Sequence, residues 1–104
     1  SSNAKLMNLT EEEYAEVDRL SREIIDSLAA ALGKEDPAGP AGLKIAELHR
    51  KWLSFFWPTY SKEAHAGLGE MYVADERFTA YYDDHAGQGA AEFLRDAIAA
   101  YAKK

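Results

Sequence analysis

The sequence contains no cysteine, and this absence excludes disulfides, thiolate catalysis and thiolate metal sites. No apolar run reaches the length of a membrane-spanning helix and no signal peptide is present, so we expect a cytoplasmic protein. Basic residues are in the minority, with 12 Lys and Arg against 18 Asp and Glu and a net charge of −6. Because such a surface repels phosphate backbones and anionic lipids, we expect this chain to contact neither nucleic acid nor a membrane.

The chain does contain enough apolar material for one domain. It has 104 residues, of which 47% are hydrophobic and 29% charged, as is usual for a globular domain. Residues 1–4 read SSNA, which looks like an expression scar, and they are set aside. We expect residues 5–104 to form a single domain with an N-terminal helix at 9–33, a linker at 34–40 and a core at 41–104.

The first half of the chain carries two helix patterns. Thr10 and Glu13 form a capping box, and apolar residues then recur at helical spacing until Gly33, which is expected to end the helix. Pro40 suits the first position of a second helix, because its missing N–H costs nothing there. We expect the inner face of this second helix to continue through Phe56.

The second half carries three further helices. The Trp57-Pro58 pair breaks the second helix, and Ser61 caps a third over about 62–73. Asp75 caps a short fourth helix, and the turn at 87–89 precedes a fifth. No period-two run or hairpin turn is present. The predicted fold is therefore all-α, a compact bundle of about five helices.

The third helix has two glycines within it. Gly67 and Gly69 flank Leu68, and glycines at such positions allow close backbone approach or leave room for a ligand. The stripe expected to face inward on this helix consists of Ala64, His65, Leu68, Met71 and Tyr72.

Aromatic residues concentrate between residues 52 and 85, which hold nine of the twelve in the chain. Several lie in the loop at 55–61, and because loops lie on the surface, these side chains need a cover. Leu48, Phe78, Phe93 and Tyr101 are expected in the core. For six others a pocket fits the pattern at least as well, since tyrosine and tryptophan combine an apolar body with a polar tip: Trp52, Phe56, Trp57, Tyr60, Tyr72 and Tyr82.

The histidines and carboxylates give weaker signals for chemistry. His49, His65 and His85 lie on three predicted helices, and three converging histidines could bind zinc. No HxxxH or HExxH pair supports such a site, so we predict core or pocket-lining histidines and neither metal nor cofactor. The carboxylate runs lie at helix ends, and no phosphate loop or nucleophile elbow is present. We therefore predict no enzymatic activity, with a three-histidine metal hydrolase as the alternative.

Two motifs cover the second half of the chain. The pattern E-x-H-x-G-L-x-E-M-Y-V-x-D-x-R-F-T runs without gaps from Glu63 to Thr79, and A-x-F-x-R-D-A-I runs from Ala91 to Ile98. From Trp52 onwards the chain resembles the TipAS antibiotic-recognition domain family. The resemblance implies an all-α, globin-like bundle around a cleft that binds large hydrophobic natural products such as thiopeptides.

The resemblance also implies a context for the domain. Members of the family lie at the C-terminus of MerR-type transcription activators, or occur as free-standing proteins that sequester drugs. Their N-terminal helices fold over the ligand, so we expect residues 9–33 to act as a mobile lid. No helix-turn-helix or coiled coil is present here. We therefore expect a free-standing binder, a shorter translation product or an excised domain, monomeric alone and dimeric within a full-length regulator.

One departure from the family concerns the mode of binding. Some members capture their ligand covalently through a cysteine in the loop before the first motif, where this chain has Thr59 and Tyr60. We therefore expect reversible binding of a peptide-like antibiotic or another multi-ring molecule. The alternative is an interaction module in which the same aromatic residues dock a helix or a partner domain. The predicted ligand-binding residues are Tyr14, Val17, His49, Trp52, Phe56, Trp57, Tyr60, His65, Leu68, Tyr72 and Tyr82.

Overall fold

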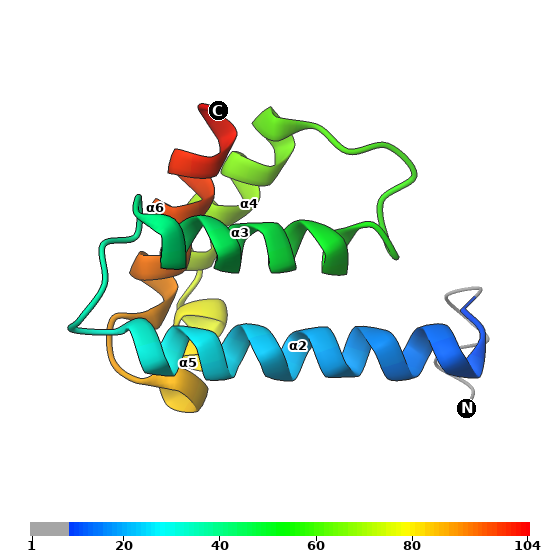
Figure 1. Cartoon of the computed structure of the whole chain (residues 1–104), viewed down its shortest axis with the longest axis horizontal. Coiled ribbons are helices and arrows are strands. Elements are labelled where there is room, and N and C mark those ends of the chain that lie inside the picture. Colours follow the sequence, from blue (N-terminus) through cyan, green and yellow to red (C-terminus); the bar gives the residue numbers. More distant parts are fainter. Residues whose placement is uncertain (1–8) are drawn as a thin grey trace.

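A computed structural model of the chain describes residues 9–104, and these residues form five α-helices and no strand. The prediction of an all-α fold with about five helices is confirmed, whereas the predicted expression scar at 1–4 lies outside the described residues. None of the described helices is long and apolar enough to cross a membrane. The helices are α2 (Glu11–Ala31), α3 (Pro40–Leu53), α4 (Lys62–Ala74), α5 (Glu76–Ala86) and α6 (Ala90–Ala102) (Figure 1).

Side-chain caps fix the starts of three helices. At α2 the Thr10 hydroxyl accepts from the Glu13 N–H and the Glu13 carboxylate accepts from the Thr10 N–H, both at 3.0 Å. Ser61 accepts from the backbone N–H three residues later at the start of α4. Asp75 accepts from the N–H two residues later at the start of α5. All three predicted caps are confirmed, because each pairs a backbone donor that the helix leaves free.

The segment between α2 and α3 packs tightly. Gly33 follows the end of α2 with φ of +76°, a conformation that favours glycine, and Pro40 is the first residue of α3. A Cβ added to Gly42 would lie 1.7 Å from the carbonyl oxygen of Pro37. The linker therefore crosses the first turn of α3 at a distance that only glycine allows.

The predicted extension of α3 through Phe56 is wrong. The α-helix ends at Leu53, and the N–H groups of Phe56 and Trp57 both bond to its carbonyl oxygen at 2.9 Å. The Ser54 hydroxyl competes for the backbone by donating to the Lys51 carbonyl oxygen. One tight turn thus replaces the last turn that the apolar pattern predicts.

Helix α6 organises the core, because it packs against each of the other four helices. In Figure 1 α2 and α3 lie side by side and antiparallel, and α4 and α6 cross them. Alanines on the buried face of α6 let these neighbours approach closely. The buried residues of α6 are Ala90, Ala91, Phe93, Leu94, Ala97 and Ile98.

The two glycines of α4 have different surroundings. Gly69 is buried, and a Cβ there would lie 3.4 Å from the Cα of Arg95 on α6, so it permits the close approach predicted for it. Gly67 is exposed and has nothing within 4 Å of an added Cβ. Ala64 is also exposed, which contradicts its predicted inward orientation. The buried face of α4 is centred on His65 instead.

Candidate functional site

A cavity of about 400 Å³ lies between α2, α3, α4 and α5. Its size is at the lower end of the range of about 300–1,000 Å³ for small-molecule sites. Aromatic and aliphatic side chains form most of the wall, and Arg77 is the charged residue among them. The lining residues are Ser21, Ile24, Ile25, His49, Trp52, Tyr72, Arg77, Phe78, Tyr81 and Tyr82.

Helix α2 supplies one wall of this cavity through the middle of its length. Ile24 and Ser21 lie one turn apart on its inner face, and Ile25 widens this face. The predicted site residues Tyr14 and Val17 lie nearer the N-terminus and do not line the cavity; Tyr14 is 40% exposed. The N-terminal helix therefore reaches the cavity through residues other than those predicted.

Four of the predicted site residues lie together in the cavity wall. They are His49 and Trp52 on α3, Tyr72 on α4 and Tyr82 on α5. The rings of His49 and Trp52 are 5.4 Å apart, and those of Tyr72 and Tyr82 are 5.0 Å apart. Three consecutive helices thus bring four predicted residues to one place.

The other predicted residues lie outside the cavity. Phe56 packs behind Trp52, with ring centroids 4.8 Å apart. Trp57 and Tyr60 pack against His65 at 6.5 and 5.4 Å, and none of these three lines the cavity. Half-buried Leu68 packs against the core.

Sequence reasoning missed most of the contribution of α5. Phe78, predicted to be a core residue, is 37% exposed and lies in the cavity wall, as does Tyr81. The prediction fails because Tyr82 is the residue that this short helix buries. Phe78, Tyr81 and Tyr82 follow the i, i+3, i+4 spacing of one helix face, and this spacing was the signal available in the sequence.

A buried hydrogen-bond chain runs from the cavity wall to the 54–61 loop. The Tyr72 hydroxyl lies 3.0 Å from Nε2 of His49, whose Nδ1 lies 2.9 Å from Nε2 of His65. The Nδ1 of His65 lies 2.7 Å from the Tyr60 hydroxyl. The two imidazole rings stack with centroids 5.0 Å apart and planes 8° from parallel. Four side chains from α3, α4 and the loop thus form one continuous polar path.

The side chains of this hydrogen-bond chain carry no charge at neutral pH. Burial, reinforced by the neighbouring His65, lowers the pKa of His49 to about 3. Burial also lowers the pKa of His65 to about 4, with the nearby Arg50 charge as the second cause. Burial raises the pKa of Tyr72 and of Tyr82, so that both hydroxyls keep their protons. The cavity therefore presents hydrogen-bonding groups without ions along this wall.

Tyr60, at the loop end of the hydrogen-bond chain, is held in place by a second set of polar contacts. The Arg50 guanidinium lies 4.2 Å from the centre of the Tyr60 ring, an arrangement that favours a cation. Arg50 also donates to the Tyr101 hydroxyl at 3.2 Å, and that hydroxyl donates to Glu47 at 2.7 Å. These contacts tie the 54–61 loop to α3 and α6.

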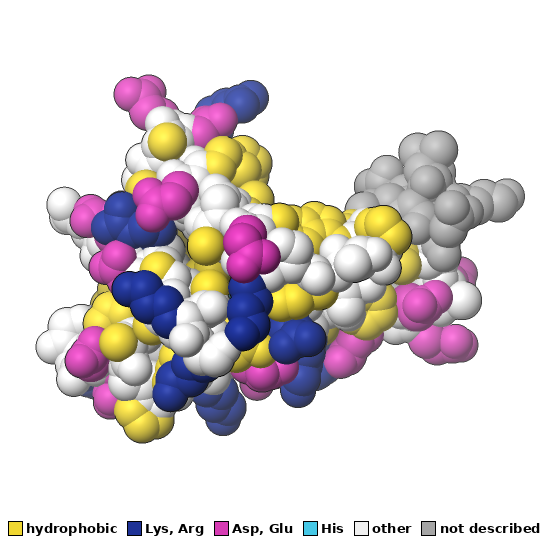
Figure 2. Space-filling view, turned by 90° about the horizontal axis from the view of Figure 1, so that it is seen from above, with side chains coloured by type: hydrophobic (Ala, Val, Ile, Leu, Met, Phe, Trp, Pro, Cys, Tyr) yellow, Lys and Arg dark blue, Asp and Glu magenta, His cyan; other side chains and the backbone are white. Residues whose placement is uncertain are grey.

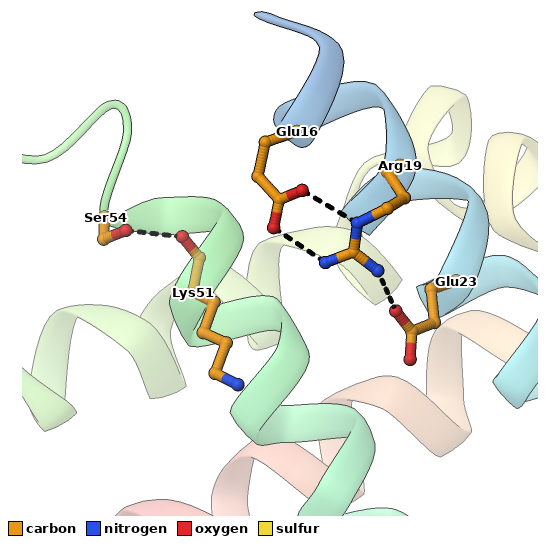
Figure 3. Close-up of polar contacts among 5 residues, drawn as sticks. All are labelled: Glu16, Arg19, Glu23, Lys51 and Ser54. Carbon is orange, nitrogen blue, oxygen red and sulfur yellow. Dashed lines mark hydrogen bonds and ion pairs between the residues drawn. The ribbon is translucent and has the colours of Figure 1, made fainter. Parts of the chain in front are cut away.

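Charged side chains hold α2 together rather than fastening it to its neighbours. Arg19 donates to Glu16 at 2.7 and 2.8 Å and to Glu23 at 2.7 Å, while Lys51 of α3 lies opposite (Figure 3). Within residues 9–104 no ion pair joins α2 to another helix. Exposed pairs of this kind contribute little, so apolar side chains such as Ile24 dock α2.

The surface shows where apolar side chains gather. Figure 2 shows acidic and basic groups interspersed over one face, with hydrophobic side chains gathered at the end where α3 runs into the 54–61 loop. Tyr60 and Trp57 in this loop are half-buried. The aromatic loop is thus only partly covered by the rest of the chain, in line with the exposure that its sequence predicts.

The histidines do not form a three-ligand metal site. Among residues 9–104, no three His, Cys, Asp or Glu side chains are placed to hold an ion. His85 is exposed on α5, and its Nδ1–H donates to the Tyr81 carbonyl oxygen at 2.7 Å. His85 therefore lies apart from His49 and His65, and only these two histidines meet, through a hydrogen bond between their rings.

Comparison with known proteins agrees with the two sequence motifs. Residues 1–101 match the TipAS antibiotic-recognition domain. The chain is 35% identical to the HTH-type transcriptional activators TipA of Streptomyces coelicolor and of Streptomyces lividans over 102 residues. The match covers 97% of this chain and 40% of each relative, so the chain spans about two fifths of their length. No solved structure matches, and the globin-like arrangement stays a prediction. The chain belongs to the TipAS antibiotic-recognition domain family.

Proposed function

We propose that this chain is a non-catalytic binding domain for a bulky, largely apolar antibiotic or drug-like molecule. The observation that carries the proposal is the apolar cavity whose wall is shared by four helices. The relatives named transcriptional activators support a role as the effector domain of a cytoplasmic MerR-type regulator. A free-standing protein that sequesters the drug would use the same cavity.

The size and chemistry of the cavity limit what it can hold. A cavity of about 400 Å³ accepts a drug-sized ring system, so the remainder of a larger peptide-like antibiotic would lie outside it. Because the chain has no cysteine, binding is reversible. Burial of about 400 Å² of apolar ligand surface would contribute on the order of 10 kcal/mol before the costs of ordering. An affinity between micromolar and nanomolar is consistent with this balance.

The test is a titration that follows tryptophan emission. Trp52 lines the cavity and Trp57 does not, so the variant Trp57→Phe leaves the cavity residue as the reporter. A thiopeptide and an albicidin-like, multi-ring aromatic peptide antibiotic are the first ligands to add. We expect a saturable change with one of these classes.

Two exposed tyrosines provide a matched pair of variants. Tyr81 is 45% exposed and lines the cavity, whereas Tyr14 is 40% exposed and lies outside it. Tyr81→Ala should weaken binding about tenfold, by the loss of one aromatic contact, and Tyr14→Ala should leave it unchanged. A flat response of the folded protein to every ligand, together with self-association, would contradict the proposal and favour the interaction module.

A further inference from the structure

The hydrogen-bond chain Tyr60–His65–His49–Tyr72 can run in two directions, and each direction is all-or-none. Each neutral imidazole carries one hydrogen, so one of its nitrogens donates and the other accepts. If the Tyr72 hydroxyl donates to His49, then His49 must donate through Nδ1 to His65, and His65 must donate through Nδ1 to Tyr60. In the opposite direction Tyr60 donates first, and His49 donates through Nε2 to the Tyr72 oxygen.

The two ends of this chain lie in different surroundings. Tyr60 is half-buried in the surface loop, where water can take the hydrogen of its hydroxyl. Tyr72 is 3% exposed and lies in the cavity wall, where the neighbouring groups are mostly apolar. The neighbouring Tyr82 hydroxyl acts as a donor to Tyr72. A Tyr72 hydrogen that is not used by His49 therefore needs another acceptor inside the cavity. Without a ligand, the direction from Tyr72 to Tyr60 satisfies every group in the chain.

A second donor lies in the same wall. The Nε1–H of Trp52 is buried and has no hydrogen-bond acceptor among the described residues. The Arg77 guanidinium is paired with Asp75 at 2.9 Å, and its side chain is 86% exposed at the edge of the cavity. The inner wall therefore offers the Tyr72 hydroxyl as a hydrogen-bond donor, beside the enclosed Trp52 N–H, without a free positive charge. A charged acceptor would lose its hydration there without gaining an ion pair, whereas a carbonyl would not carry that cost.

We propose that Tyr72 is the specificity-determining residue of the cavity, selecting ligands whose buried end carries an uncharged hydrogen-bond acceptor, and that donation to this acceptor reverses the chain as far as Tyr60. The inference rests on the proposed binding function. Ligand occupancy then changes both histidine tautomers and makes the Tyr60 hydroxyl a donor to His65. The state of the cavity is thereby transmitted to the 54–61 loop.

The reversal conserves protons. Each hydrogen moves one place along the chain, from Tyr72 to His49, from His49 to His65 and from His65 to Tyr60. Tyr60 releases one hydrogen to water and Tyr72 takes one from water. All four side chains are neutral before and after, so no net charge is created in the buried site.

The experiment uses two small probes of nearly equal size, acetophenone and ethylbenzene. Both suit an apolar cavity, but acetophenone alone carries a carbonyl acceptor. Trp52 emission in the Trp57→Phe variant reports binding of each probe, and long-range ¹H–¹⁵N spectra of the histidine rings report the tautomers of His49 and His65. We expect both rings to carry their hydrogen on Nδ1 in the free protein and on Nε2 with acetophenone bound. Ethylbenzene should bind and leave both rings unchanged.

Two variants separate the roles of neighbouring tyrosines. Tyr72→Phe should weaken acetophenone binding about fivefold and abolish the tautomer change, while ethylbenzene affinity stays within about twofold. Tyr81→Phe removes a hydroxyl from the same wall but outside the hydrogen-bond chain, so it should retain the tautomer change. The wild-type comparison of the two probes keeps the test valid if Tyr72→Phe does not fold.

The outcomes distinguish this inference from the function on which it rests. Acetophenone that binds without altering the histidine spectra overturns the role of Tyr72 and leaves the binding function intact. The same result follows if ethylbenzene alters the spectra equally, or if Tyr81→Phe abolishes the change. If neither probe alters Trp52 emission at millimolar concentration, the cavity does not bind small apolar molecules and the inference fails, while the titration with the two antibiotic classes decides the proposed function separately.

Discussion

Single residues decide how closely the helices of this domain approach. Gly67 and Gly42 both lie within helices, but a Cβ at Gly67 meets nothing within 4 Å and a Cβ at Gly42 meets the Pro37 carbonyl oxygen at 1.7 Å. Gly67→Ala should therefore raise the free energy of unfolding by up to about 1 kcal/mol, through helix propensity alone. Gly42→Ala should lower it by about 2 kcal/mol or more, because the linker must move away. Urea denaturation measures both changes, and a stabilised Gly42→Ala variant would contradict the packing of the linker.

The sequence is informative about residues where the chemistry is local. The caps at Thr10, Ser61 and Asp75 are correctly predicted, since each depends on a backbone donor within three residues. The orientations of Ala64 and Phe78 are not, because they depend on how a whole helix is rotated against its neighbours. An apolar stripe indicates which face is buried to within about one residue, and one residue corresponds to about 100° of rotation.

At the scale of elements, α2 is divided between a packed and an unpacked half. Its buried residues begin at Leu20, and residues 11–19 contain none. The capping box and ion pairs within the helix hold this N-terminal half, and each contributes about 1 kcal/mol or less. Amide hydrogens at 15–19 should therefore exchange faster than those at 24–31.

One substitution tests this division directly. Thr10→Ala removes the capping box and should accelerate exchange at 15–19 severalfold, while exchange at 24–31 stays unchanged. Ser61→Ala, which removes the corresponding cap of α4, is the control and should leave α2 unaffected. Equal acceleration along the whole of α2 would mean that the helix opens as one unit, as the predicted lid at 9–33 would.

Apolar stripes in the sequence predict the helices more reliably than they predict which helices contact one another. The apolar spacing correctly assigns five helices, but the end of α3 at Leu53 depends on how Ser54 bonds to the backbone. The aromatic residues predicted to share a pocket are divided by the buried histidine pair, with Tyr72 on the cavity side and Tyr60 on the loop side. The spacing places His49 and Tyr72 on inward faces, and only the packing of both α3 and α4 against α6 brings them together.

The stability of the whole molecule should depend on pH through the buried pair. In the folded state the pKa of His49 is about 3 and that of His65 about 4, against 6.5 for an ordinary histidine. The unfolded chain therefore binds more protons below pH 6.5, so stability is complete above that pH and is lost as the pH falls toward 4. Two such groups should lower the free energy of unfolding by up to about 2.7 kcal/mol per pH unit between pH 6 and 5.

Urea titrations at several pH values measure this slope. His85→Gln changes a histidine outside the pair and should keep the slope of the wild type. The window between pH 6.5 and 5 lies above the range in which carboxylates titrate, which assigns the slope to histidine. Stability that is flat across this window would show that the pair accepts protons in the folded state.

The contact between the two imidazoles also restricts which substitutions this domain can accumulate during evolution. His49 and His65 each supply the partner that the other needs at 2.9 Å, and loss of one leaves a buried nitrogen unpaired at a cost of about 1–3 kcal/mol. Replacement of both by apolar side chains of similar shape costs less than replacement of either alone once Tyr72, whose hydroxyl lies 3.0 Å from Nε2 of His49, is replaced by phenylalanine as well. Substitutions at these two positions should therefore arise in pairs, so that diverging lineages keep both histidines or replace both.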